Sequence, residues 1–440
     1  MNPEGNGNGK SRGGGNRHSS GNGHANGTGN GHGRRVVVTG MAGITSIGQS
    51  WAEIEKSLHT NTSGIEHMSE WARYVELNTR LAGPVRNFTA PSHFTRKVTR
   101  SMGRVSLLAT CATEMALAHA GLLDDESIRD GRMGVAYGSS TGSPDAVRDF
   151  GDMLSSCRMG NINATTYLRM MPHTTAANIG VYFGLKGRVI PASSACTSGS
   201  HSIGYAYEAI KYGRQLMMVA GGAEELCASE AAVFDTLFAT STRNQMPKTT
   251  PRPFDRDRDG LVIGEGACTL VLEDLEHAKA RGARIHAEIV GFGSNSDGDH
   301  LTHPNTHTMQ RAMELALEDA GVPATVVGYV NAHATATEQG DIAETQATAR
   351  LFGARVPVST LKGHIGHTLG ACGAIESWAT IEMLNADWYA PTLNLENVDE
   401  RCGELDYIAR EGRRAQCEYA MNNNFAFGGI NTSLLFRRLS

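Results

Sequence analysis

One cysteine and two histidines stand in sequence contexts of the same kind. Cys196 lies in Pro-Ala-Ser-Ser-Ala-Cys-Thr-Ser-Gly, His333 in Tyr-Val-Asn-Ala-His-Ala-Thr, and His367 in Lys-Gly-His-Ile-Gly-His-Thr-Leu-Gly. Each context has a strand-like apolar run, a turn of small residues, and then a polar residue on or before a helix. A thiol at a helix start faces the positive end of the backbone dipole, which lowers its pKa. We expect Cys196 to be an acyl-transfer nucleophile, with the two imidazoles acting on the carbonyl oxygen.

A single buried Cys or His is most often an ordinary core residue, so the three contexts must be weighed together. Other candidates in the chain are weaker. Asp255-Arg-Asp-Arg-Asp-Gly260 has the start of a calcium loop, but the twelfth position is Gly266 and not Glu. Pro304 interrupts the helix that would align three nearby histidines, His300, His303 and His307. We expect no metal site, and we expect these histidines in a loop near a pocket mouth.

Composition limits the class of protein. The chain has 440 residues, 19% of them charged, and a formal net charge of −5, which argues against a nucleic-acid-binding surface. Eight cysteines without a C-x-x-C pair are typical of reduced thiols in a cytoplasmic protein. No apolar run approaches the ~18 residues of a membrane span, and no signal peptide is evident. The first 34 residues contain 12 Gly and 7 Asn, so we predict a disordered tail over 1–34.

The rest of the chain alternates strand-like and helical patterns, which predicts an α/β protein with buried sheets. Strands are expected at 134–137, 216–221 and 268–272, and helices at 105–120 and 200–212. Three pairs of segments also match each other: 189–196 with 356–363, 134–141 with 328–335, and 35–43 with 287–293. We therefore predict two pseudo-repeated halves, 35–275 and 276–440, with the nucleophile of the first opposite the histidines of the second.

The three motifs, with Pro253–Gly266 and Asn424–Asn431, closely resemble those of type II β-ketoacyl-acyl-carrier-protein synthases. The resemblance extends from about Arg35 to the C-terminus. It implies the five-layered α-β-α-β-α thiolase fold, a dimer, no cofactor, and an acyl carrier protein that presents acyl or malonyl phosphopantetheine. It also implies that Cys196 accepts the acyl chain, while His333 and His367 bind the malonyl thioester oxygen during decarboxylation.

The resemblance assigns further residues. Lys362 and Glu376 form a buried ion pair that orients His367, and Asp341 and Glu344 support the same network. Phe425 matches the gating phenylalanine and the second donor to the thioester oxyanion. His364 has no catalytic counterpart and is expected as a lining or surface residue. The chain departs from the usual pattern at three alanines where Gly or Ser is common, Ala334, Ala336 and Ala426.

Two more assignments concern the acyl pocket and the carrier. Thr141 falls where a fatty-acid synthase has a bulky isoleucine gate, so a smaller residue here would leave the tunnel open toward a dimer partner. The basic cluster Arg96, Lys97 and Arg100 lies on an otherwise acidic chain and is expected to dock the acidic carrier, although an ordinary solvated basic turn is an almost equal alternative.

Several related functions are less compatible with the residues. A degradative thiolase would carry a second cysteine in Asn424–Asn431, chalcone-type enzymes use Cys, His and Asn, and a chain-length factor lacks the nucleophile. A carrier-binding scaffold subunit is the alternative outside catalysis. Among the synthases, segments such as Gly222–Cys227 and Ala232–Thr240 are most similar to ketosynthases of aryl-polyene and other highly reducing type II polyketide systems, which pair with a chain-length factor. Fatty-acid elongation is the second candidate.

Overall fold

A computed structural model describes residues 33–439 of the chain. These residues form one compact unit beginning at Arg34. The predicted disordered tail, 1–34, lies almost entirely outside the described residues. Within the described part, no helix is long and apolar enough to cross a membrane.

Eleven strands follow one hydrogen-bonded order, β13-β11-β10-β15-β16-β9-β1-β8-β6-β4-β5. Most of their side chains are buried on both faces, which is why the sequence shows apolar runs instead of strict alternation. The strands are β1 (Val36–Thr45), β4 (Met133–Gly138), β5 (Val189–Ala192), β6 (Met217–Glu224), β8 (Gly266–Asp274), β9 (Ala287–Ser296), β10 (Val327–Asn331), β11 (Pro357–Ser359), β13 (Asp406–Tyr407), β15 (Tyr419–Ala426) and β16 (Ile430–Arg437).

Two small sheets accompany the large one. They are built from β2 (Glu66–His67), β3 (Leu81–Gly83) and β7 (Ile263–Gly264), and from β12 (Trp388–Tyr389) and β14 (Arg413–Arg414). The α-helices are α1 (Trp51–His59), α2 (Arg96–Thr99), α3 (Arg104–His119), α4 (Pro144–Ser156), α5 (Ala164–Met170), α6 (Thr174–Phe183), α7 (Ser198–Lys211), α8 (Ala228–Asp235), α9 (Leu275–Ala280), α10 (Thr306–Ala320), α11 (Glu338–Phe352), α12 (Lys362–Ile365) and α13 (Cys372–Ala386).

The predicted internal repeat is confirmed by the strand order. The first half runs β5-β4-β6-β8-β1 and the second runs β11-β10-β15-β16-β9, which is the same order relative to the chain. Parallel and antiparallel pairings also match between the halves, and the halves join where β1 pairs antiparallel with β9. The predicted equivalents, β1 with β9, β4 with β10 and β5 with β11, occupy equivalent places. The boundary at 275/276 falls between β8 and β9 and stays a prediction.

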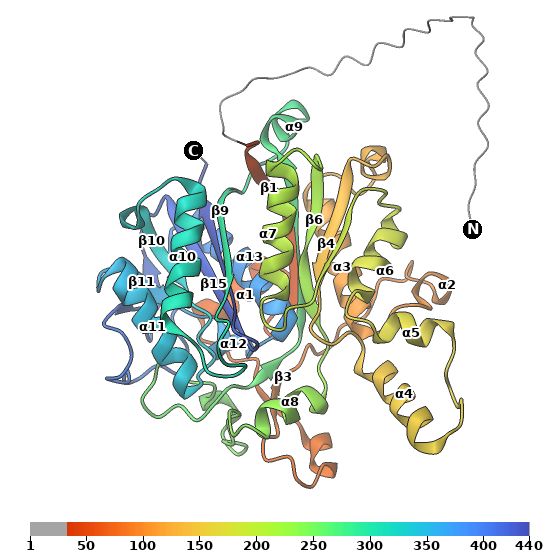
Figure 1. Ribbon diagram of the computed structural model, residues 1–440, viewed down its shortest axis with the longest axis horizontal. Coiled ribbons are helices and arrows are strands. Elements are labelled where there is room, and N and C mark those ends of the chain that lie inside the picture. The colour runs from red at the N-terminus through yellow and green to blue at the C-terminus, as the bar shows by residue number, and fades with distance from the viewer. Residues whose placement is uncertain (1–32, 440) are drawn as a thin grey trace, which may run out of the picture. The chain divides into compact units, whose positions relative to one another are not determined.

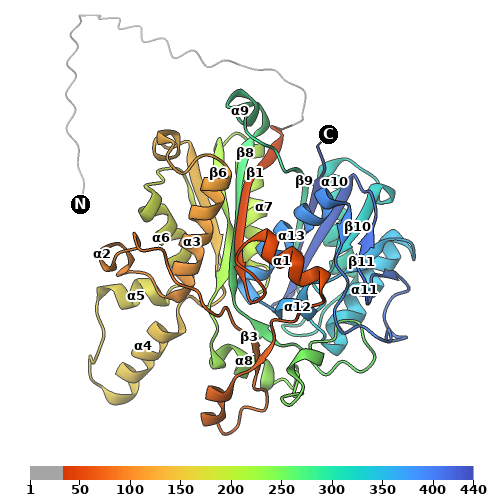
Figure 2. The same cartoon turned by 180° about the vertical axis from the view of Figure 1, so that it is seen from behind.

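The layers follow the predicted thiolase architecture. Helices α7 and α13 lie against each other between the two halves of the sheet, whereas α3 and α6 cover the outer face of the first half, and α10 and α11 that of the second (Figure 1; Figure 2 shows the opposite side). Helix α13 has no polar face, because almost all of its residues are buried. The strands β5 and β11 therefore deliver the turns that follow them to one central place, from opposite halves.

Candidate active site

Cys196 lies in the turn between β5 and α7. The residue before it, Ala195, has a φ of 51°, a left-handed conformation that is costly for a residue with a Cβ. Hydrogen bonds within the turn hold this conformation: Ser198 Oγ donates to Ala195 O at 2.7 Å and accepts from Ser194 N at 2.9 Å. The sharp turn places Cys196 two residues before the first residue of α7 with its thiol directed at the second half of the molecule.

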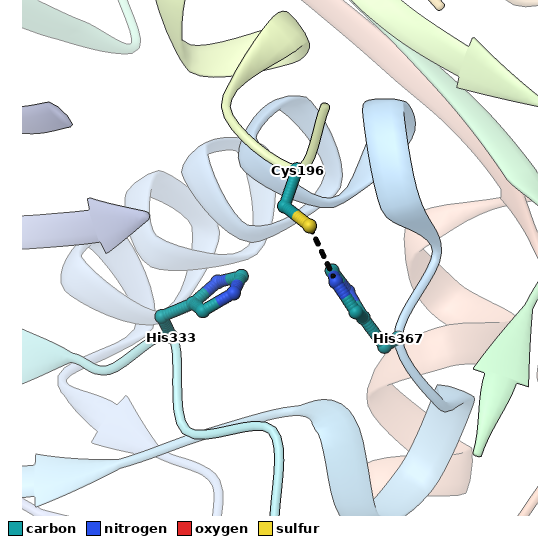
Figure 3. A group of neighbouring side chains, drawn as sticks. All are labelled: Cys196, His333 and His367. Carbon is teal, nitrogen blue, oxygen red and sulfur yellow. Dashed lines mark hydrogen bonds between the residues drawn. The ribbon is translucent and has the colours of Figure 1, made fainter. Parts of the chain in front are cut away.

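His367 is the nearest neighbour of the thiol. Its Nε2 lies 2.9 Å from Cys196 Sγ, and Figure 3 shows both imidazole rings pointing toward the sulfur. The backbone of His367 is fixed by a β-bridge to Ile263, in which its N–H donates to Val262 O at 2.7 Å and its carbonyl accepts from Gly264 N at 2.8 Å. The charged run Asp255–Asp259 of the segment Pro253–Gly266 therefore leads directly into β7, the strand that positions this histidine.

His333 approaches from the turn after β10, and its ring centroid is 5.0 Å from that of His367 at an interplanar angle of 88°. A row of buried, hydrogen-bonded polar side chains lies behind the His333 ring. Lys362 Nζ is bonded to Glu376, whose Oε2 accepts from Asn424 Nδ2 at 2.7 Å, and the same amide lies 3.4 Å from His333 Nδ1. The predicted ion pair is therefore present, but it connects to His333 through Asn424 and not directly to His367.

These contacts favour one tautomer in both rings. Asn424 offers a donor to Nδ1 of His333, so this nitrogen acts as the acceptor and the proton resides on Nε2. Nδ1 of His367 is buried without a hydrogen-bond partner among the described residues. A buried N–H without an acceptor is rarer in proteins than an unused acceptor, which again places the proton on Nε2. Both histidines then direct an N–H toward the space beside the thiol.

Burial keeps the side chains of Cys196, His333 and His367 neutral in the resting enzyme. Burial lowers the pKa of His333 and of His367, and the charge of Lys362 lowers both further. Burial also raises the pKa of Cys196 to about 12, although Lys362 and two backbone N–H groups act in the other direction. Burial therefore reverses the lowering of the Cys196 pKa that a place at a helix start predicts. The loss of hydration outweighs the helix dipole because the thiol is 5% exposed.

Asp341 and Glu344 stabilise the turn that carries His333. Ala334 and Ala336, two of the three alanines singled out above, have positive φ values of 30° and 65°. Glu344 accepts from the N–H groups of His333 and Ala334, both at 2.7 Å, and Asp341 accepts from Ala336 N at 3.1 Å. The carboxylates thus compensate for backbone strain next to the histidine. Ala426 has no such strain, because it ends β15 without a positive φ.

The structure favours a residue other than Phe425 as the second oxyanion donor, while the gating role of Phe425 stays a prediction. This residue belongs to β15 and pairs with Asn431 in the β15–β16 ladder. The two backbone N–H groups that face the Cys196 thiol are those of Cys196 itself and Phe427, two residues further on. The chain turns away from the sheet only after Ala426, through Gly428 and Gly429 with positive φ. We therefore assign the second oxyanion donor to Phe427, whose ring packs 5.1 Å from that of Phe234.

A cavity of about 480 Å³ opens onto the thiol. It is lined by Cys196 and both histidines at its inner end, and by exposed apolar residues such as Phe238 and Leu301 toward solvent. His303 also lines it, as expected for a loop at the mouth, whereas His307, expected in the same loop, lies in the first turn of α10. The cavity is large enough to hold an extended thioester arm beside the nucleophile.

The other predicted residues lie elsewhere. Thr141 is exposed in the turn after β4, outside the lining of this cavity, and its hydroxyl is 2.8 Å from Glu230 and 3.2 Å from Glu224. The basic side chains of Arg96, Lys97 and Arg100 are exposed on and just after α2. His364, expected as a lining or surface residue, is instead fully buried, and its ring nitrogens lie within 3.2 Å of the carbonyls of Thr62 and Pro391.

Among the described residues, two overlapping groups have ligand atoms close enough to hold a metal ion. They are Cys196 with His333 and His367, and His333 with Cys372 and Glu376. The sulfur atoms of Cys196 and Cys372 and the carboxylate of Glu376 already have hydrogen-bond partners in the network above. The prediction that the protein needs no metal stays a prediction.

Two family models match most of the chain. The N-terminal domain of beta-ketoacyl synthases matches residues 33–278, and the C-terminal domain matches residues 286–396. A 3-oxoacyl-[acyl-carrier-protein] synthase 2 of Vibrio cholerae is 39% identical over 414 residues, which cover 92% of this chain and 99% of the relative.

Solved structures give the same result. The crystal structure of a beta-ketoacyl synthase from Burkholderia phymatum has a TM-score of 0.92 and 60% identity, and covers 92% of this chain and 100% of its own. The ishigamide ketosynthase/chain length factor has a TM-score of 0.84 and 29% identity, with 93% of this chain and 100% of that chain covered.

The chain therefore belongs to the beta-ketoacyl synthase family. It is an acyltransferase of the ketosynthase class, a 3-oxoacyl-[acyl-carrier-protein] synthase in activity. Cys196, His333 and His367 are identifiable from the sequence. Asn424 and Phe427 are not, although both lie in the motif Asn424–Asn431.

The buried ion pair behind His333 gives a first prediction. Lys362→Met leaves Glu376 buried without its cation, so we expect a loss of roughly 3–5 kcal/mol in the free energy of unfolding, measured by urea denaturation. Lys362→Met with Glu376→Met removes both charges and should recover most of that loss. Lys279→Met, which breaks the exposed pair with Glu276, should cost less than about 1 kcal/mol. A Lys362→Met cost no larger than that of Lys279→Met would contradict this account.

Proposed function

We propose that the protein catalyses decarboxylative Claisen condensation of an acyl thioester with malonyl-acyl-carrier protein, in the cytoplasm, with Cys196, His333 and His367 as its catalytic residues. The observation that carries the proposal is the convergence of one thiol from the first half and two neutral imidazoles from the second at the inner end of one cavity.

Acylation comes first. The Cys196 sulfur forms a bond to the acyl carbonyl carbon, and the bond from that carbon to the carrier's pantetheine sulfur breaks. The thiol proton leaves with the pantetheine sulfur. During the attack the carbonyl oxygen becomes an oxyanion, and we assign its stabilisation to the N–H groups of Cys196 and Phe427, which face the thiol. One such donor lowers the barrier by about 2.7–4 kcal/mol.

Condensation follows with malonyl-carrier protein in the cavity. The carbon–carbon bond to the malonyl carboxylate breaks, CO₂ leaves, and its electron pair forms an enolate on the thioester oxygen. The N–H groups of His333 and His367 stabilise this oxygen. The enolate carbon then attacks the acyl group on Cys196, the S–C bond breaks, and the released thiolate takes up a proton. Neutral imidazoles suit this role, because they donate hydrogen bonds without a charge to be desolvated.

Labelling and kinetics test these roles together. Incubation with acyl-carrier protein should leave an acyl adduct on the peptide that contains Cys196, mapped by mass spectrometry. His333→Ala and His367→Ala should retain some adduct but lose condensation by about 10²–10³-fold. Cys372→Ala is the matched control, since Cys372 is buried beside the nucleophile and its removal should leave the adduct on Cys196. An adduct on another cysteine, or near-normal condensation by both histidine variants, would refute the assignment. A scaffold subunit would tolerate Cys196→Ala without loss of pathway output.

We further propose that the enzyme builds a polyene chain in a type II polyketide pathway, paired with a chain-length-factor subunit. The similarity to the ishigamide ketosynthase/chain length factor supports this. So does β5, which ends the strand order and exposes Val189 at 53%. An edge strand with exposed apolar side chains favours pairing with another subunit. The alternative is fatty-acid elongation by a homodimer, which the greater identity to the Vibrio cholerae enzyme favours.

Co-purification separates the two alternatives. Co-expressed with a homologue that lacks the nucleophilic cysteine, the chain should purify as a one-to-one complex and, with reducing partner enzymes, yield conjugated unsaturated chains by mass spectrometry. A chain that stays a homodimer beside this homologue and elongates saturated long-chain substrates would instead establish the fatty-acid function. Thr141 as a chain-length gate stays a prediction under either outcome.

Docking of the carrier gives a further prediction. We propose that Arg96, Lys97 and Arg100 attract the acidic carrier protein, because all three are exposed on one short segment. Reversing all three to Glu should raise KM for the carrier about tenfold at low salt and flatten its salt dependence, since the attraction is screened within ~8–10 Å. Reversing exposed Arg350, Arg355 and Arg410 of the second half is the matched control. Equal KM values in the two triple variants would exclude this dock.

A further inference from the structure

Two buried carboxyl groups without a cation lie behind the nucleophile, and the mechanism above does not use them. Glu224 ends β6 and is fully buried, and Glu230 in the first turn of α8 is 5% exposed. No ion pair within residues 33–439 involves either of them. Thr141 Oγ1 lies 3.2 Å from Glu224 Oε1 and 2.8 Å from Glu230 Oε1, so both carboxyls approach one hydroxyl. A single hydroxyl proton cannot satisfy both, and two like charges so close disfavour double ionisation.

Their surroundings differ in a way that decides which carboxyl is charged. Glu224 accepts from Ser139 Oγ at 2.8 Å, Ser140 N at 2.8 Å, Ser140 Oγ at 2.5 Å and Gly370 N at 3.0 Å. Glu230 has one backbone donor, Cys227 N at 3.2 Å. Donors stabilise the ionised form, so Glu224 carries the charge and Glu230 the proton. Burial raises the pKa of both groups, and that of Glu230 well above its usual value, with the charge of Glu224 as the second cause.

Glu224 is also in contact with the catalytic platform. Its bond to Gly370 N holds the turn three residues after His367, where Leu369 has a φ of 46°. Gly370 packs closely against Gly199 of α7 and Gly222 of β6. A Cβ added to Gly199 would lie 3.0 Å from the carbonyl oxygen of Gly370, and a Cβ added to Gly222 would lie 2.3 Å from it. The carboxylate therefore lies just behind the helix start that bears Cys196, and its charge disfavours the thiolate there.

We propose that Glu224 is an additional positioning residue of the ketosynthase site: it stays ionised because Glu230 holds the single proton of the pair, and its charge adds to burial in disfavouring the thiolate of Cys196 in the resting enzyme. It opposes Lys362, which favours the thiolate from the other side. The titratable and charged groups that face the sulfur are thus His367, His333, Lys362, Cys372 and Glu224, and the group that faces Glu224 from α8 is Glu230.

Alkylation of Cys196 tests the charge. Iodoacetamide modification, mapped to the Cys196 peptide, is followed from neutral to alkaline pH in the full-length protein. Glu224→Gln removes the charge and should displace the rate profile by roughly one pH unit, which is about tenfold faster alkylation at a fixed pH below the midpoint. Glu230→Gln should leave the profile in place, because its carboxyl is already neutral. Glu225→Gln is the matched control, a buried carboxyl on the next residue that instead accepts from Val105 N at 2.7 Å.

Glu224→Asp separates charge from packing. It keeps the charge while it disturbs the packing, so it should alkylate at a rate near that of the wild type. Any one of three results would overturn the proposal. Glu224→Asp could accelerate alkylation as much as Glu224→Gln, Glu224→Gln could fail to accelerate it, or Glu230→Gln could accelerate it as much as Glu224→Gln. Infrared difference spectroscopy between wild type and Glu230→Gln gives an answer even if Glu224→Gln does not fold. At neutral pH the wild type should show a protonated carboxylic acid band that Glu230→Gln lacks. If the wild type does not show this band, the shared proton is refuted.

Discussion

The active site depends on the desolvation of a small set of charged groups between the two halves of the fold. Lys362 is buried by the packing of α12 and α13, and burial alone would lower its pKa, but the attraction of Glu376 outweighs this and raises it. The pair cannot be separated without leaving one charge in the interior. Through Asn424 the same pair fixes the His333 ring, and its field also acts on His367 and Cys196. A single ion pair therefore links the geometry of the site to the neutral state of its histidines.

Backbone strain is concentrated at the same place. Ala195, Ala334, Ala336 and Leu369 all have positive φ, and each lies in a turn next to one of the three catalytic candidates. Such conformations persist only where neighbouring groups hold them. Here the neighbouring groups are mostly carboxylates that accept backbone N–H groups, as Glu344, Asp341 and Glu224 do. The acidic residues of the site thus act on the backbone more than on the substrate. Backbone N–H donors, with Arg258 beside Asp341 as the one cation paired with any of these three within residues 33–439, explain how the carboxylates remain buried.

Much of the fold and the three central residues could be predicted from the sequence, because both depend on local patterns. Apolar runs followed by small-residue turns mark β5, β10 and β11, and the matches between segments reveal the repeat. The errors arise where tertiary packing decides the outcome. A helix start predicts a lowered pKa for the Cys196 thiol, but burial reverses the direction of the pKa shift. The motif around Phe425 is correct, but only the end of the β15–β16 ladder shows that Phe427 turns its N–H to the sulfur. Likewise, nothing local in the sequence indicates that His364 is enclosed.

The repeat also explains why one half supplies a nucleophile and the other its histidines. The turn after β4 is the counterpart of the turn after β10, and in the sequence match Ser139 stands where the second half has His333. Both turns are held in the same way: Glu224 accepts from Ser140 N, as Glu344 accepts from Ala334 N. Carboxylates from non-equivalent elements, Glu224 at the end of β6 and Glu344 in α11, thus support two equivalent turns, of which only one presents an imidazole. In the first half, the hydroxyl of Ser139 binds the clamp itself, at 2.8 Å from Glu224. The support of the first turn therefore leaves a carboxylate behind Cys196 that holds the backbone and also acts on the nucleophile.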